Sequence, residues 1–340
     1  SLAILMQMEE GRLAIDEPVT RWLPEFAGMR VLNDPAGPLS DTRPAAREVT
    51  VEDLLTHRSG VGAGFTDVGP IAEARNARLG SPLANPLTPD EWLKAVGELP
   101  LTYAPGERFH YGDSTDVLGF LAARIDGRPL GELLRRRIFQ PLGMADTGFW
   151  VPPEKRGRMA HMYLRPDDGG PLRDVSYPLG DQPPAFESGG GGLISSAEDY
   201  LKFARLLLGG GAADGVRLVR PETVALMTAD RLTAAQRGIP AFGLPWWWSG
   251  QGFGLGVSTV TDAQKYEIDG AGSVGAFGWP GAFGTWWMAD PAQDLVWIYL
   301  VQDAVPLGQA SLGQLVSGER LGARRSRRTF QKMVYGALEP

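Results

Sequence analysis

Cysteine is absent from the 340-residue chain, and histidine occurs only as His57, His110 and His161. The absence of cysteine excludes disulfides, thiolate metal sites and a cysteine nucleophile, but it leaves the compartment open, because a periplasmic protein can also lack cysteine. The three histidines show no His-Glu-x-x-His or other paired-histidine spacing. We therefore expect no metal site and no cofactor, and we assign no localisation.

An excess of positive charge is also missing. The 33 lysines and arginines are outnumbered by 40 acidic residues, which gives a net charge of −7 and no uniform positive field to attract nucleic acid or an anionic membrane. The apolar run at residues 2–8 has no basic flank and stops at Glu9, so it is neither a signal peptide nor a membrane span. We expect a small, uncharged substrate, no nucleic acid partner and no membrane span; the oligomeric state is open.

Helical spacing of apolar residues dominates the first two thirds of the chain, and strand-like runs dominate the last third. This order predicts an α/β (α+β) fold, in which an antiparallel sheet is flanked by helices and a helical or irregular second subdomain is added. We assign residues 1–60 and 190–340 to the sheet domain and 61–189 to the helical subdomain. The expected helices cover 2–10, 51–58, 89–96, 117–125, 130–139, 196–208 and 312–337, and the expected strand runs cover 253–261, 277–288 and 295–301. The stretches 27–48, 62–89 and 150–185 are expected to be loops or irregular.

Two common catalytic motifs are absent. No phosphate-binding Walker loop occurs, which argues against phosphoryl transfer. The Gly-x-Ser-x-Gly elbow of α/β-hydrolases is not formed either, because Ser273 has Ala271 where the first glycine should stand.

Several short motifs occur instead in a specific order. They are Gly11-Arg-Leu-Ala-Ile-Asp-Glu-Pro-Val19, Leu54-Leu-Thr-His-Arg-Ser-Gly60, Tyr111-Gly-Asp113, Pro141-Leu-Gly-Met144, Ser188-Gly-Gly-Gly-Gly-Leu193 and Trp279-Pro-Gly281. Together they make residues 1 to about 305 resemble the serine hydrolases of the class C β-lactamase superfamily, which have a fold like that of penicillin-binding proteins. Within it, the chain is most similar to the family VIII carboxylesterases.

The resemblance implies a nucleophile in a Ser-x-x-Lys motif at the start of a buried helix. No serine of the 340 residues has a lysine three positions later, and Ser1 is followed by Ile4 at that position. Residues 2–10 match the remainder of this helix, so we expect the motif in an N-terminal segment a few residues before Ser1. The alternative is a relative that has no nucleophile.

The same resemblance implies roles for the Tyr111 motif. Tyr111 matches a tyrosine whose phenol lies between the nucleophile and the lysine and takes part in proton transfer, which requires a cation close to the phenol. The alternative is a half-buried tyrosine at a helix entrance. Asp113 stands where asparagine is common and is expected to contact substrate. Because an ionised aspartate only accepts hydrogen bonds, recognition of an amide is in doubt, and the alternative is an N-cap for the helix from Ser114.

Trp279, Pro280 and Gly281 stand where β-lactamases carry Lys-Thr-Gly, and by the resemblance they line the substrate site. Tryptophan and proline supply neither the ammonium nor the hydroxyl that would hold a substrate carboxylate, so an uncharged ester is expected. By the same resemblance, the backbone N–H of Ala282 is expected to be an oxyanion donor, together with the N–H of the nucleophile. The alternative is a tryptophan on a sheet face with a proline at a strand edge.

Other residues receive weaker expectations. His57 resembles a structural histidine of the family and is not expected to be a base. Trp247, within an exposed-looking block at 246–248, is expected to line an acyl or alcohol pocket or else to make a core contact. The 188–192 loop is expected to contribute its backbone and flexibility, not a side chain. The basic residues of the last helix are expected on a solvated face, with a nucleic-acid patch as the alternative; they are Arg320, Arg324, Arg325, Arg327, Arg328 and Lys332.

The function that these motifs imply is a serine hydrolase that cleaves short-chain carboxylic esters through an acyl-enzyme. A β-lactamase, a D-amino peptidase or an acyltransferase on the same fold is the enzymatic alternative. A catalytically inert binding relative is the alternative from another class.

Overall fold

The computed structural model describes residues 1–80, 85–164, 166, 170–176, 180–266, 271–304 and 321–338, with the side chains of 321–325 left out. Its α-helices are α1 (Leu2–Glu9), α2 (Val51–Leu55), α3 (Gly69–Leu79), α4 (Pro89–Gly97), α5 (Ser114–Asp126), α6 (Leu130–Leu134), α7 (Ala197–Leu208), α8 (Pro221–Thr228), α9 (Ala234–Arg237), α10 (Ala263–Tyr266) and α12 (Leu321–Gly336). Short 3₁₀ helices and one π-helical turn are η1 (Val19–Arg21), η2 (Pro24–Phe26), η3 (Arg135–Phe139, the π turn) and η4 (Pro153–Arg158).

The strands form one main sheet and three small ones. The main sheet has five antiparallel strands in the order β11 (Leu295–Tyr299), β10 (Trp286–Asp290), β9 (Phe277–Pro280), β8 (Ser258–Val260) and β7 (Gln251–Phe253). The small sheets pair β1 (Arg30–Leu32) with β2 (Thr42–Pro44), β5 (Ala212–Ala213) with β6 (Val216–Arg217), and β3 (Tyr163–Leu164) with both β4 (Arg173–Asp174) and β12 (Asp303–Ala304).

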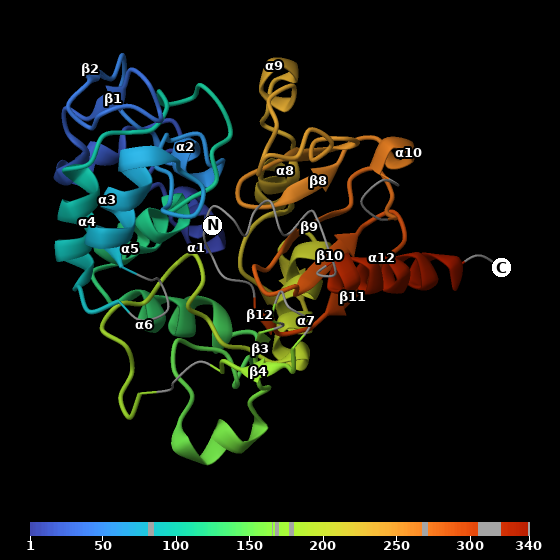
Figure 1. The fold of residues 1–340 in the computed structure, drawn as a ribbon. Helices are drawn as coiled ribbons and strands as arrows, with labels where there is room; N and C mark the ends of the chain where they lie inside the picture. The colour runs from blue at the N-terminus through green and yellow to red at the C-terminus, as the bar shows by residue number, and fades with distance from the viewer. Residues whose placement is uncertain are drawn as a thin grey trace.

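Helices cover both faces of the main sheet. Neighbouring residues of a strand point to opposite faces, and β10 shows this directly. Trp287 packs against Tyr200 of α7, with ring centroids 5.7 Å apart, whereas Trp286 lies under the guanidinium of Arg327 from α12 at 4.0 Å. The expected antiparallel sheet flanked by helices is therefore present. Figure 1 shows α1 to α6 gathered on the other side of the molecule.

Local sequence signals explain the predicted helices that form. The hydroxyl of Thr50 accepts a hydrogen bond from the N–H of Asp53 at 3.2 Å, and the Asp53 carboxylate accepts one from the N–H of Thr50 at 2.9 Å, which caps α2. After α1, Gly11 takes φ +70°, the left-handed conformation in which glycine ends a helix without strain. Helices α4, α5 and α7 also form close to their expected positions.

Several expectations need correction. The stretch 62–89 is not only a loop, because it contains α3, whose first turn accommodates Pro70 and which buries only a thin stripe of residues. The run 253–261 is a hairpin instead of one strand, since Gly256 turns the chain at φ +95°. The run 277–288 is divided between β9 and β10 by a turn at 281–285. The helix expected over 130–139 changes to a π turn at Arg135, and 27–48 contains β1 and β2. Of the closing helix, 312–320 lies outside the described residues.

The first two helices pack on the helical side. Both α1 and α2 contact α5, although the proposed division places residues 1–60 with the sheet. The division at 60 and 190 stays a prediction. In the described part of the chain, no helix has the length and apolarity that crossing a membrane requires.

The basic residues of α12 do not all lie on a solvated face. Arg327 is buried against Trp286, and the guanidinium of Arg328 lies 5.6 Å from the ring centroid of Trp246. For these two arginines the expectation is wrong, because a planar guanidinium stacks well on an indole face. Lys332 is exposed, and nothing is described of the side chains of Arg320, Arg324 and Arg325.

The packing of α5 gives a test of the core. Leu121 on α5 is fully buried, whereas Leu201 on α7 is 39% exposed. We predict that Leu121→Ala lowers the free energy of unfolding by about 2–5 kcal/mol, because it leaves a cavity. The matched control Leu201→Ala should change it by less than about 0.5–1 kcal/mol. Urea unfolding curves measure both, and equal losses would contradict the described packing.

Candidate active site

Tyr111 lies in a short segment that leads into α5, and hydrogen bonds fix the backbone on both sides of it. The N–H of His110 donates to the carbonyl of His57 at 2.7 Å, and the N–H of Asp113 donates to the carbonyl of Gly62 at 3.3 Å. The ring of Tyr111 packs on the ring of His57, with centroids 4.5 Å apart. The phenol is therefore held at the N-terminal end of α5.

The structure brings Tyr111 together with Trp279, which is remote in sequence. Their ring centroids are 5.7 Å apart, and Trp279 also packs on Phe253 at 4.8 Å and on Trp247 at 6.2 Å. Burial raises the pKa of the Tyr111 phenol, while a hydrogen bond with the Trp279 side chain opposes this effect. Because its pKa is raised overall, the Tyr111 phenol is neutral at neutral pH.

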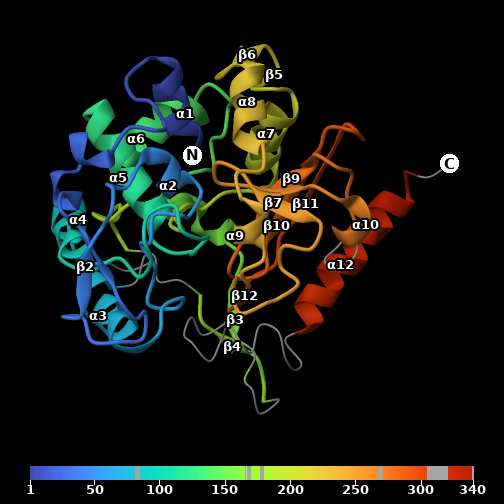
Figure 2. The same ribbon diagram turned by 90° about the horizontal axis from the view of Figure 1, so that it is seen from above.

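Helix α1 begins at the same end of the molecule. The side-chain amide of Gln7 donates to the carbonyl of Ala122 at 2.9 Å, and Arg12 donates to the carbonyl of Ile125. The two helices therefore run in the same direction, so that α1 starts near the end of α5 that follows Tyr111. Ser1 lies against Gly256 in the turn between β7 and β8. Figures 1 and 2 place this start of α1 between the helices and the main sheet.

The strand with Trp279 and Pro280 extends past its neighbour. Pairing of β8 with β9 ends at Gly278, whereas β10 pairs with β9 as far as Pro280. After it, the N–H of Gly281 donates to the carbonyl of Thr285 at 2.8 Å. Among the described residues, no acceptor is found for the N–H of Ala282, and Ala282 is exposed. Its N–H is therefore accessible to an external hydrogen-bond acceptor.

Two carboxyl groups lie at the start of α5. Asp113 is the N-cap residue of α5, as the alternative expected, and its carbonyl accepts from the N–H of Val117 at 3.1 Å, but its side chain makes no cap hydrogen bond. Burial, followed by the nearby Asp116 carboxylate, raises the pKa of Asp113, and burial also raises that of Asp116. Asp116 accepts hydrogen bonds from the Ser188 hydroxyl at 2.5 Å and the Gly190 N–H at 3.3 Å. Burial therefore favours the neutral form of both carboxyl groups, and a neutral carboxyl can donate a hydrogen bond.

The 188–192 loop is anchored by a side chain, which corrects the expectation that only its backbone matters. Ser188 is buried, and its hydroxyl donates to Asp116 while it accepts from the N–H of Gly191 at 3.1 Å. Gly189 lies against Gly119 of α5 and the carbonyl of Thr115, where a Cβ would not fit. The loop therefore packs directly on α5.

The tryptophan block is less exposed than expected. Trp247 and Trp248 are buried, and Trp246 is partly buried. Trp247 packs on Phe242 at 4.7 Å, and Phe242 also contacts Tyr111 at 5.4 Å. Seen from Tyr111, Trp247 therefore lies behind the rings of Trp279 and Phe242. A contact of Trp247 with substrate stays a prediction.

The His57 side chain is buried and neutral. It is 3% exposed, and burial, together with the nearby His110, lowers its pKa to about 3. Its Nε2 lies 3.3 Å from the Thr115 hydroxyl. His57 has φ +51°, a left-handed conformation that is uncommon for a non-glycine residue.

The sequence did not point to Phe65 and Phe242, which contact the Tyr111 ring, or to Asp67, which contacts His110. Their sequence positions carry no motif.

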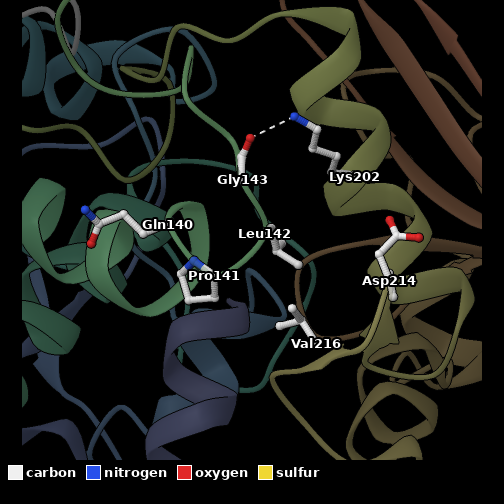
Figure 3. A pocket seen from close by; sticks show the side chains of 8 residues that line it. Gln140, Pro141, Leu142, Gly143, Lys202, Asp214 and Val216 are labelled. Atoms are coloured by element: carbon white, nitrogen blue, oxygen red, sulfur yellow. Dashed lines mark hydrogen bonds between the residues drawn. The ribbon is translucent and has the colours of Figure 1, made fainter.

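A cavity of about 280 Å³ lies elsewhere, between Gln140–Gly143, Lys202 and the β5–β6 hairpin. Figure 3 shows that Lys202 there donates to the carbonyl of Gly143, at 2.7 Å. None of the predicted site residues lines this cavity. Within the described residues, no three acidic or histidine side chains converge as a metal site.

Comparison with known proteins identifies the family. The Beta-lactamase family model matches residues 1–315, so the chain belongs to that family. Protein Rv1367c of Mycobacterium tuberculosis is 44% identical over 339 residues, which cover 99% of this chain and 83% of that protein. Esterase EstB of Burkholderia gladioli is 31% identical and is matched over 89% of this chain and 74% of its own length. The solved structure of simvastatin synthase LovD from Aspergillus terreus, in its LovD9 mutant, has a TM-score of 0.74 and 26% identity, covering 99% of this chain and 81% of that one. The expected resemblance and fold class are confirmed, and the family includes an esterase.

The burial of His57 predicts a pH effect on stability. The unfolded chain binds a proton on this histidine below about pH 6.5, but the folded protein does so only near pH 3, so acidification favours unfolding. Between pH 7 and pH 5 the loss from this one group is about 2 kcal/mol. Urea unfolding of His57→Asn, which tolerates the left-handed backbone, should show a pH dependence that is smaller by about this amount. An unchanged pH dependence would contradict a neutral, buried His57.

Proposed function

We propose that this chain forms the catalytic centre of a serine carboxylesterase, which cleaves short-chain, uncharged esters through an acyl-enzyme. One observation carries the proposal: Tyr111 contacts Trp279 of the 279–282 segment, and α1 starts near this contact. A proton-transfer group, an unpaired backbone N–H and a helix N-terminus then surround one place, as acyl transfer to a serine requires.

The proposed reaction has two steps. The serine oxygen bonds to the ester carbonyl carbon, the alcohol leaves with a proton, and water then cleaves the acyl-serine and restores the hydroxyl. We propose that Tyr111 relays the proton and that the Ala282 N–H, with that of the nucleophile, stabilises the oxyanion. Because Ser-x-x-Lys does not occur in the 340 residues, we propose that this motif precedes Ser1. A lysine there would counter the burial that keeps the Tyr111 phenol protonated.

The substrate class follows from the surroundings of the phenol. The rings nearest to Tyr111 are those of His57, Phe242, Trp279 and Phe65, and none of these bears a charge in the folded protein. Trp279 and Pro280 offer no cation to a carboxylate. This favours an apolar ester over a β-lactam or peptide, and an alcohol acceptor in place of water gives the acyltransferase alternative.

Removing the phenol hydroxyl tests the role of Tyr111. We predict that Tyr111→Phe lowers kcat for p-nitrophenyl butyrate about 100- to 10,000-fold, the range for a positioned acid–base group. The matched control Tyr200→Phe changes a tyrosine packed on Trp287 of the main sheet and should leave kcat nearly unchanged. Both variants should keep the native circular dichroism spectrum. Near-normal turnover of Tyr111→Phe would remove Tyr111 from the mechanism.

Substrate charge gives an independent test. The full-length protein should hydrolyse p-nitrophenyl acetate and butyrate with a kcat/KM well above that for nitrocefin, whose carboxylate finds no ammonium at position 279. The ratio of the two kcat/KM values is the measurement. Comparable values would contradict the proposed preference for uncharged esters, and no ester hydrolysis at all would favour the inert relative.

A further inference from the structure

The segment that carries Tyr111 rests on a buried ionic network, which begins at Asp67 and Arg75. Their salt bridge joins Asp67 Oδ2 to Arg75 Nε at 2.7 Å, and the two side chains are 0% and 2% exposed. The second oxygen, Asp67 Oδ1, accepts from the Thr102 hydroxyl at 2.8 Å and lies 2.7 Å from Nε2 of His110. His110 immediately precedes Tyr111, so the network ends one residue from the phenol.

The charges determine the direction of the hydrogen bond. Burial acts to raise the pKa of Asp67, but the bond from His110 and the charge of Arg75 outweigh it and lower this pKa. Asp67 is therefore ionised and only accepts hydrogen bonds, which places a proton on Nε2 of His110. A buried ion pair that loses one partner leaves an uncompensated charge, so this arrangement resists change.

The backbone of His110 is held as tightly as its ring. Its N–H donates to the carbonyl of His57 at 2.7 Å, so both ends of the residue are fixed. On the other side of Tyr111, Gly112 packs directly on Gly62, where a Cβ would overlap the Gly62 backbone. Gly62 in turn lies against the Asp67 carboxylate and the His110 ring. The two residues that flank Tyr111 are thus clamped by one cluster.

We propose that Asp67, with Arg75 as its counterion, is a positioning residue that orients the Tyr111 phenol through the imidazole of His110. The proposal rests on the proposed function of Tyr111. The network does not touch the substrate, so its loss misplaces the phenol and lowers kcat while KM changes little. A small misplacement of a catalytic group is sufficient to reduce the rate greatly.

The experiment compares His110 variants in two backgrounds. His110→Leu removes the donor to Asp67, whereas His110→Gln keeps an N–H close to the position of Nε2. Each is made in the native full-length protein and in Tyr111→Phe, and kcat and KM are measured with p-nitrophenyl butyrate. The matched control is Glu25→Gln, which breaks the ion pair of Glu25 with Arg124 (2.6 Å) away from Tyr111.

We expect His110→Leu to lower kcat about 10- to 100-fold with KM within about twofold, and His110→Gln to recover most of this loss. In the Tyr111→Phe background, His110→Leu should cost less than about twofold, because groups that act as a unit are not additive. Glu25→Gln should leave kcat unchanged.

An equal loss in both backgrounds, no recovery with His110→Gln, or the same loss in Glu25→Gln would overturn the positioning role. Should His110→Leu not fold, Thr102→Val removes another donor to Asp67, and its fall in kcat, expected to be a few-fold, must likewise vanish in Tyr111→Phe. Absence of ester hydrolysis in the native protein would instead reject the proposed function, whereas native activity that is insensitive to His110→Leu rejects the positioning role alone.

Discussion

The contact between the rings of Tyr111 and Trp279, 5.7 Å apart, connects the two sides of the molecule at the candidate site. Tyr111 belongs to the entrance of α5, and Trp279 belongs to β9, the central strand of the main sheet. The proposed reaction depends on this contact, because the phenol and the Ala282 N–H have to reach the same ester carbonyl. Each partner is fixed independently, Trp279 by pairing of β9 with β10 and Tyr111 by the hydrogen bonds of its neighbours.

Two acidic side chains, Asp113 and Asp116, influence the Tyr111 phenol. Asp113 and Asp116 both act to raise the pKa of the phenol, in addition to its burial. Asp116 accepts hydrogen bonds from the Ser188 hydroxyl and the Gly190 N–H, and neither of these donors is a cation. An ammonium next to Tyr111, as the proposed Ser-x-x-Lys motif would supply, would oppose these effects and lower the pKa of the phenol.

The sequence predicts the parts of this arrangement that depend on local signals. The Thr50 and Asp53 capping pair, the Gly11 helix end and the spacing of apolar residues in α5 and α7 are each readable within one or two turns. The motifs at Tyr111 and Trp279 are recognisable by their resemblance to those of a known family. The contact between the two rings cannot be predicted from this resemblance.

Long-range contacts could not be read from the sequence. The salt bridge of Asp67 with Arg75 depends on α3, whose thin apolar stripe gave no clear helical signal. The burial of Arg327 follows from an indole on β10, which an arginine-rich helix does not reveal by itself. The turn at Gly256 separates two strands that share one apolar pattern, so composition alone suggested a single strand.

The central claim is that Tyr111 and Ala282 serve a serine nucleophile. Labelling of the full-length protein with a fluorophosphonate, followed by peptide mass spectrometry, tests it most directly because the reagent marks an activated serine. The account predicts one labelled serine, which has lysine three positions later and lies N-terminal to Ser1, and much slower labelling in Tyr111→Phe. Absence of labelling, or labelling of a serine within the 340 residues, would contradict it.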